Sequence, residues 1–309
     1  MLDGMGPVLC LVSAACFGAL AIFGKFAYDA GVSPAALVLV RFALAAVLLG
    51  VVLVVRRISV RLPGRAMAIA IGLGAFGYAT QASLFFSALR RMDASVLSLI
   101  LYTYPILVTV GAVLLGRERL TRRRLAALLA ASAGTLLVLA GAGGAAFRPA
   151  GALMAFGAAV TYTVYILVAD TVVDRVPPLV LSTLVMAGAA GSLGGRALVT
   201  GGVGLGFGAA GWFWLGCIAV VSTVAAMLAF FAGLRRTGAS TAAILSTFEP
   251  VVTTGLAALA FGESLTPVQL AGGLLVLSSA VVLQLRPPAS GKVDRKVDRG
   301  MAISIDGRR

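Results

Sequence analysis

Two charged side chains lie deep within apolar stretches of this sequence. Arg41 lies about seven residues into a stretch that covers 34–55, and Glu249 lies near the centre of another that covers 240–261. A charge at the centre of a hydrocarbon layer costs about 2.5–3.5 kcal/mol on insertion scales, so it needs a partner, water or a function. We predict that Arg41 lines a polar path and that Glu249 couples to a proton or to the solute. The structural alternatives are an Arg41 that extends to a helix end or binds backbone carbonyls, and a Glu249 that hydrogen-bonds the carbonyls left free by Pro250 or pairs with Arg41.

Uncharged polar and aromatic side chains are also found inside these stretches. Tyr78, Gln81 and Phe85 are spaced i, i+3 and i+7, which places them on one face of a helix. An amide inside a membrane must form hydrogen bonds, and a cavity supplies water or a ligand for them. We therefore predict a cavity whose walls suit a solute with polar and apolar parts, although packing is the alternative for any single residue. The predicted substrate-binding residues are Phe17, Tyr78, Gln81, Tyr102, Tyr162 and Tyr165.

The sequence lacks the residues on which several kinds of enzyme depend. It has no histidine, so imidazole metal sites and Ser–His or Cys–His nucleophile pairs are excluded. Cys10, Cys16 and Cys217 lie inside apolar stretches and do not have the spacing of metal ligands. We predict no catalytic residue, no metal and no cofactor, and we do not expect an enzyme.

The composition determines which elements must position these residues. Hydrophobic residues make up 60% of the chain, charged residues 12%, and the mean hydropathy is +1.05. An apolar helix of about 20 residues spans the ~30 Å of a bilayer core. The sequence predicts an all-α integral membrane protein with ten transmembrane helices, at 6–26, 34–55, 66–89, 95–115, 122–141, 151–170, 178–197, 208–233, 240–261 and 267–285. Ser33-Pro34 and Thr266-Pro267 are predicted helix starts, the second with Gln269 completing a capping box.

An internal repeat relates the two halves of the chain. Residues 85–129 recur 145 positions later, with 17 of the 45 positions identical and no gap. Ten spans in two copies give five spans per copy, and an odd number forces the second copy to be inverted in the membrane. We predict a first repeat over 1–145, an inverted second repeat over 146–286, and a disordered basic tail over 287–309. Inverted repeats with broken helices are typical of secondary transporters, and Pro105 and Pro250 are equivalent mid-helix residues, each of which frees a backbone carbonyl and permits a kink.

The distribution of arginine and lysine predicts the orientation. With the N-terminus inside, the cytoplasmic loops carry 12 such residues and the opposite loops carry five. This bias follows the positive-inside rule and places both termini in the cytoplasm. The net charge of +14 is mostly this topology signal plus the basic tail, and its scatter over many loops argues against nucleic-acid binding.

Two segments resemble a known module. Ala94-Ser95, Tyr104-Pro105 and Gly116-Arg117-Glu118-Arg119-Leu120-Thr121 in the first half correspond to Ala239-Ser240, Glu249-Pro250 and Gly262-Glu263-Ser264-Leu265-Thr266 in the second. These motifs resemble the EamA module of the drug/metabolite transporter superfamily, which includes the YddG-type amino-acid exporters. The first copy departs from the pattern by inserting Arg117 after Gly116 and by having Tyr104 where the second has Glu249. Glu118 and Glu263 are predicted to have turn and capping roles.

The resemblance implies a ten-helix carrier of the bacterial inner membrane. Together with the inverted repeat, it leads to the expectation of an alternating-access exporter of amino acids or similar small metabolites, driven by the solute gradient or by protons. The expected partners are that small solute, the lipid bilayer and protons. The alternatives are a drug or nucleoside-like exporter on the same scaffold and an integral membrane enzyme.

Overall fold

The computed structural model of the chain describes residues 5–89, 91, 97, 100–140, 149–261 and 266–284. All regular secondary structure in these ranges is helical. The predicted tail over 287–309 and Glu263 lie outside the described residues, and the predicted span over 95–115 is described only in part.

The helices of the first half form five spans. They are α1 Met5–Asp29, α2 Pro34–Val55, a continuous span of α3 Gly64–Gly72, η1 Leu73–Tyr78 and α4 Ala79–Leu89, then α6 Tyr104–Leu114 and α7 Arg122–Ala140. The second half repeats this order. Its spans are α8 Pro149–Ala169, α9 Pro178–Val199, a continuous span of α10 Ala209–Ala219, η2 Val220–Ala225 and α11 Ala226–Thr237, then α12 Ala239–Ser246 with α13 Phe248–Phe261, and α14 Pro267–Gln284.

These spans confirm the predicted fold class of ten transmembrane helices in two inverted five-helix repeats. Seven of the described helical stretches are long and apolar enough to cross a membrane, and 104–114 and 267–279 are shorter apolar helices. The helix α7 begins with Arg122, Arg123 and Arg124 before its apolar part. The protein is therefore a multi-pass membrane protein.

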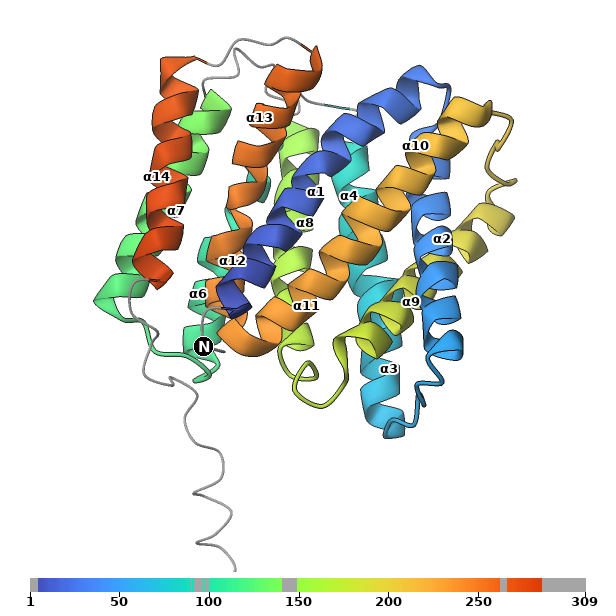
Figure 1. Cartoon of the computed structure of the whole chain (residues 1–309), viewed down its shortest axis with the longest axis horizontal. Coiled ribbons are helices and arrows are strands. Elements are labelled where there is room, and N and C mark those ends of the chain that lie inside the picture. Colours follow the sequence, from blue (N-terminus) through green and yellow to red (C-terminus); the bar gives the residue numbers. More distant parts are fainter. Residues whose placement is uncertain are drawn as a thin grey trace, which may run out of the picture.

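The packing of the helices follows the repeat. The first span of one half packs against the third and fourth spans of the other half: α1 contacts α10 to α13, and α8 contacts η1, α4 and α6. Equivalent spans also pair directly, because α2 packs on α9 and α7 packs on α14. In Figure 1, α7 and α14 form one edge of the molecule, while α2 and α9 lie at the opposite edge. This exchange of partners is the relation that a pseudo-two-fold axis between inverted repeats produces.

Two helix starts have the predicted capping. Ser33 accepts a hydrogen bond from the Ala36 backbone N–H at 3.2 Å, with Pro34 at the first helical position. At the start of α14, the Thr266 N–H donates to Gln269 Oε1 at 2.9 Å, and the Gln269 N–H donates to Thr266 Oγ1 at 3.2 Å. The predicted capping box is confirmed.

Pro105 and Pro250 lie next to helix breaks and not inside continuous helices. The ninth span ends at Ser246 and restarts at Phe248, so Glu249 and Pro250 occupy the first turn of α13. The fourth span has a turn at Tyr102 and Thr103 before α6 begins. The predicted kink is thus a full interruption in both repeats. A proline needs no hydrogen-bond acceptor for its nitrogen in the first turn of a helix, which is why the second half-helix starts there.

The third and eighth spans each contain a π-helical segment that periodicity did not predict. The two π segments are nearly equivalent in the repeat: the 145-residue offset places η1 at 218–223, so η2 begins two residues later than its counterpart. A π turn holds an extra residue and often marks a functional position, and Tyr78 is the last residue of η1. Gly74 and Gly77 lie in η1 and admit close contact with the Val185 carbonyl and the Tyr165 ring.

Candidate functional site

A cavity of about 100 Å³ lies where α1, α2, η1, α4, α8 and the two broken spans meet. We call it the central cavity. Its walls are Phe17, Leu20, Arg41, Tyr78, Gln81, Ala82, Phe85, Phe86, Leu101, Tyr102, Tyr104, Tyr162 and Glu249. Seven of the eight residues predicted from the sequence are therefore brought together around one space, and only Tyr165 is not among its walls.

Arg41 is held inside the protein by aromatic groups. Its side chain is 3% exposed, and its Nη2 donates a hydrogen bond to the Tyr78 hydroxyl at 3.0 Å. The guanidinium carbon lies 4.5 Å from the centre of the Phe42 ring and 5.7 Å from that of Tyr78. Within the described residues, its Nε has no hydrogen-bond partner. Arg41 is thus a buried cation whose Nε donor is unused, and cation–π contacts stabilise it.

Glu249 lines the same cavity as this cation. It lies in the first turn of α13, where the partial positive charge of a helix N-terminus favours a carboxylate. Its carboxyl group interacts with the Tyr102 hydroxyl and with the more distant charge of Arg41. Arg41 and Glu249 both belong to the described part of the chain and form no ion pair within 4.0 Å, so they do not neutralise each other directly.

The first span positions both Glu249 and Phe17. A Cβ atom on Gly18 would lie 3.0 Å from the Glu249 carbonyl oxygen, so α1 crosses α13 with its backbone almost in contact. Thr253 Oγ1 donates to the Gly18 carbonyl at 3.0 Å across the same crossing. This crossing joins the two repeats at the break in the ninth span and leaves Phe17 facing the cavity.

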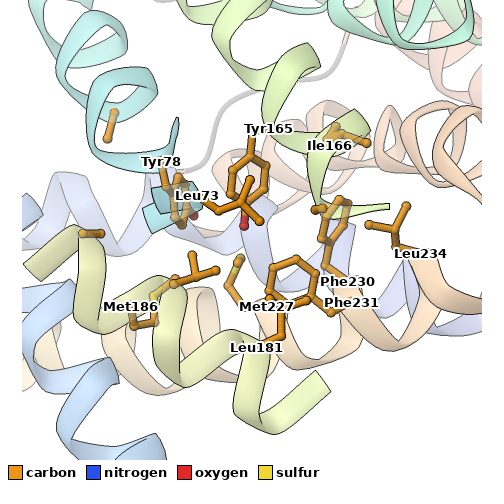
Figure 2. Close-up of a cluster of buried hydrophobic side chains, with 14 of the residues drawn as sticks. Leu73, Tyr78, Tyr165, Ile166, Leu181, Met186, Met227, Phe230, Phe231 and Leu234 are labelled. Atoms are coloured by element: carbon orange, nitrogen blue, oxygen red, sulfur yellow. The ribbon is translucent and has the colours of Figure 1, made fainter. Parts of the chain in front are cut away.

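Tyrosine rings form a continuous wall on the side of α8. Tyr104 and Tyr162 have ring centres 4.8 Å apart, and Tyr102 lies 6.0 Å from Tyr104. Tyr165 lies behind this wall: it is 2% exposed and packs 5.9 Å from Tyr162, 5.6 Å from Tyr78 and 6.4 Å from Phe231. Figure 2 shows Tyr165 between Tyr78 and Phe231 in the buried cluster where α8 and α11 meet. Tyr165 therefore packs against the wall from behind and does not line the cavity.

Some wall residues were not predicted as site residues. Tyr104 is the clearest, because a signal was present: it is the repeat partner of Glu249 and directly precedes Pro105. Leu20, Phe86 and Leu101 are apolar residues in apolar helices, and nothing in their type or spacing separates them from lipid-facing neighbours. Their place in the wall depends on how the helices rotate against one another.

A second cavity adjoins the first. It has about 170 Å³, and we call it the outer cavity. It shares Ala82 and Phe86 with the central cavity. Its other walls are Pro34, Ala35, Val38, Leu39, Ser83, Ser87, Leu193, Arg196, Ala197, Thr200, Gly202 and Val203. Arg196 donates to Ser83 Oγ at 3.4 Å in this cavity, which lies at the helix ends predicted to face away from the cytoplasm.

Comparisons with known proteins place the chain in a family. One crystal structure superposes with a TM-score of 0.78 at 21% identity, covering 92% of this chain and 98% of that one, which shows a shared fold. The chain is 26% identical to the uncharacterized transporter YcbK of Bacillus subtilis, over 86% of this chain and 88% of that protein. It is 27% identical to an uncharacterized transporter of Archaeoglobus fulgidus, over 69% of this chain and 74% of that protein. The model of the EamA-like transporter family matches twice, at residues 4–140 and 149–285, so the chain belongs to the EamA-like transporter family.

Proposed function

We propose that this protein is an alternating-access secondary transporter that exports amino acids or similarly small zwitterionic metabolites across the bacterial inner membrane. The observation that carries the proposal is the central cavity, which presents one guanidinium and one carboxylate that are not paired with each other. A zwitterion offers the complementary charges in one small molecule.

The two charges suit the two ends of such a solute. The Nε of Arg41 has no hydrogen-bond partner among the described residues, and a guanidinium binds a carboxylate through two parallel hydrogen bonds. Glu249 can accept from an ammonium group, and the faces of Tyr104 and Tyr162 attract the same positive charge. A dehydrated zwitterion entering an apolar cavity needs both charges satisfied, because an unpaired charge is expensive in a low-dielectric interior. The aromatic wall then contacts the apolar part of the solute.

The test of this function is solute counterflow in proteoliposomes that contain the purified protein. The panel is a set of labelled zwitterionic amino acids, the matching amines and carboxylic acids that lack one charge, and nucleosides. We expect exchange of zwitterions and at least about tenfold less exchange of either singly charged analogue, because removing one partner leaves a buried charge unsatisfied. Exchange of nucleosides alone would contradict the proposal and favour the nucleoside-like exporter that the aromatic wall also admits.

The cavity wall is expected to set selectivity. Gln81→Ala and Tyr162→Ala each remove a wall group, and a hydrogen bond to the solute contributes about 1 kcal/mol, or several-fold in affinity. We expect the order of preferred amino acids to change while the amount of inserted protein does not. The control is Val164→Ala, an exposed position on the same helix as Tyr162. Unchanged selectivity in both wall variants would assign these side chains to packing.

Glu249 is proposed to couple transport to protons. Glu249→Gln keeps the shape of the side chain and resembles the protonated carboxyl group, but it cannot bind or release a proton. We expect this variant to insert normally, to exchange solute more slowly because the ammonium group loses its carboxylate partner, and to show a remaining rate that no longer varies with pH. Asp29→Asn, an exposed carboxylate at the end of α1, is the control and should retain the wild-type profile. An unchanged pH profile in Glu249→Gln would leave the carboxylate with a structural role beside Pro250.

The orientation of the protein is expected to follow the positive-inside rule. The loops predicted to be cytoplasmic carry 12 arginines and lysines against five on the other side. A reporter enzyme that is active only outside the cytoplasm should therefore be active when fused after Arg148 and inactive when fused after Arg286. Activity at the second position would overturn the arrangement of ten spans with an internal N-terminus.

A further inference from the structure

The connection between α6 and α7 reaches across from the first repeat to the second. We call residues 115–124 the strap. Arg117 Nη1 donates to the Leu167 carbonyl at 2.6 Å, near the end of α8. Glu118 Oε1 accepts from the Ser240 N–H at 3.2 Å, near the start of α12. A connection that merely turned the chain would not need partners 50 and 122 residues away.

Glu118 is oriented within the strap before it meets α12. Arg124 Nη1 donates to Glu118 Oε2 at 2.7 Å, which leaves Oε1 for Ser240. The side chains of Arg124 and Glu118 are only 13% and 10% exposed, so water screens this pair weakly. Gly238 precedes α12 with φ of +81°, and a Cβ there would lie 2.9 Å from Glu118 Oε1. The residue before α12 must therefore be small for this carboxylate to approach the helix end.

The helix that Glu118 holds leads directly to the central cavity. All eight residues of α12 are buried, and the helix packs against α6, α1 and α11. It ends at Ser246, and Glu249 follows on α13. The strap and α12 therefore close the central cavity on this side, which is the predicted cytoplasmic side. On the other side, the cavity meets the outer cavity at Ala82 and Phe86.

Movement of α12 away from α6 would open the closed side and must break the bond between Glu118 and Ser240. A carboxylate bonded to a free N–H at a helix start is a strong, charge-assisted interaction, so this bond stabilises the closed arrangement over the open one. The bond is local to the helix end, and neither Glu118 nor Ser240 is among the walls of the central cavity.

We propose that Glu118 is a gating residue: its carboxylate, oriented by Arg124, latches the start of α12 and stabilises the state in which the central cavity is closed at the strap. This inference rests on the proposed alternating access and does not depend on which solute is carried. Loss of the latch should shift the population toward the state that is open at the strap by about tenfold.

The experiment measures access to α12 with a single cysteine. Ser246→Cys is nearly isosteric, and Ser246 is 6% exposed in the closed state. The native residues Cys10, Cys16 and Cys217 are replaced by alanine, and a membrane-impermeant maleimide is added from the strap side of sealed vesicles. We expect Glu118→Ala to raise the labelling rate by about tenfold. Arg119→Ala, an exposed neighbour in the strap, is the matched control and should label at the parental rate.

Arg124→Gln provides a second variant if Glu118→Ala does not fold. It keeps Glu118 but removes the charge that orients it, so labelling should rise by several-fold. Labelling at the parental rate in a folded Glu118→Ala or Arg124→Gln protein would overturn the latch. The assay contains no solute, so its outcome is separate from counterflow. Faster labelling together with no amino-acid exchange would support the latch and refute the proposed solute.

Discussion

Replacing Arg41 with methionine is expected to lower solute exchange by roughly 10- to 100-fold while the protein still inserts into the membrane. A hydrogen bond to a charged group contributes about 1.5–3 kcal/mol, and each 1.4 kcal/mol is tenfold in binding. Methionine keeps much of the length of the side chain and packs against aromatic rings, so the contacts with Phe42 and Tyr78 are partly retained. The loss should therefore come from the missing charge and its donors.

Two further arginine variants make this result specific. Arg41→Lys keeps the charge but loses the planar fork, and we expect exchange between that of the wild type and that of Arg41→Met. Arg56→Met removes an exposed arginine directly after the same helix and should leave exchange unchanged. These expectations are tested by measuring counterflow of the variants and the wild type at equal amounts of inserted protein. Wild-type exchange in Arg41→Met would show that the buried cation has no part in transport.

Adding a methyl group to Gly188 or Gly74 is expected to destabilise the protein strongly. The two glycines lie at one helix crossing: a Cβ on Gly74 would overlap the Val185 carbonyl, and a Cβ on Gly188 would overlap the Ile71 carbonyl. Both obstacles are backbone atoms, so α9 would have to separate from the continuous span of α3 and η1. Overpacking costs typically 1–3 kcal/mol, and the lost packing along two spans adds to that.

The same helix offers a matched control for the glycine variants. Gly191 and Gly195 also lie in α9, but a Cβ at either position would meet open space. Gly191→Ala and Gly195→Ala should therefore be neutral or stabilise the helix by up to about 1 kcal/mol. Gly188→Ala and Gly74→Ala should lower the unfolding temperature in detergent and the yield of folded protein. Equal unfolding temperatures for Gly188→Ala and Gly191→Ala would contradict the close approach of α9 and η1.

The capping role of Glu118 was predicted correctly from the sequence, but the helix that it caps was not. Glu118 lies in a turn and does cap a helix, as its position after a span suggested. The helix that it caps belongs to the other repeat, 122 residues away. A capping preference reports only that a carboxylate is favourable near free N–H groups, and it contains no information on which helix supplies them.

Hydrophobicity and the internal repeat determined the spans, their number and the inverted relation of the halves. These properties follow from the sequence because each span must satisfy its backbone hydrogen bonds internally, so a span is a local feature of about 20 residues. The same reasoning singled out Arg41, Gln81 and Glu249, since polar groups that cannot face lipid must face one another or a cavity, and all three line the central cavity.

Only the tertiary structure decided what depends on the rotation and approach of helices from different halves. It separated Tyr162, which lines the central cavity, from Tyr165, which supports the wall from behind. It also placed the break in the ninth span at Thr247 and paired Gly74 with α9. These outcomes depend on contacts between residues far apart in the chain, and such contacts leave no period or motif in either segment alone. The polar and hydrophobic character of a span was therefore readable from the sequence, whereas the partner that each face meets was set by packing.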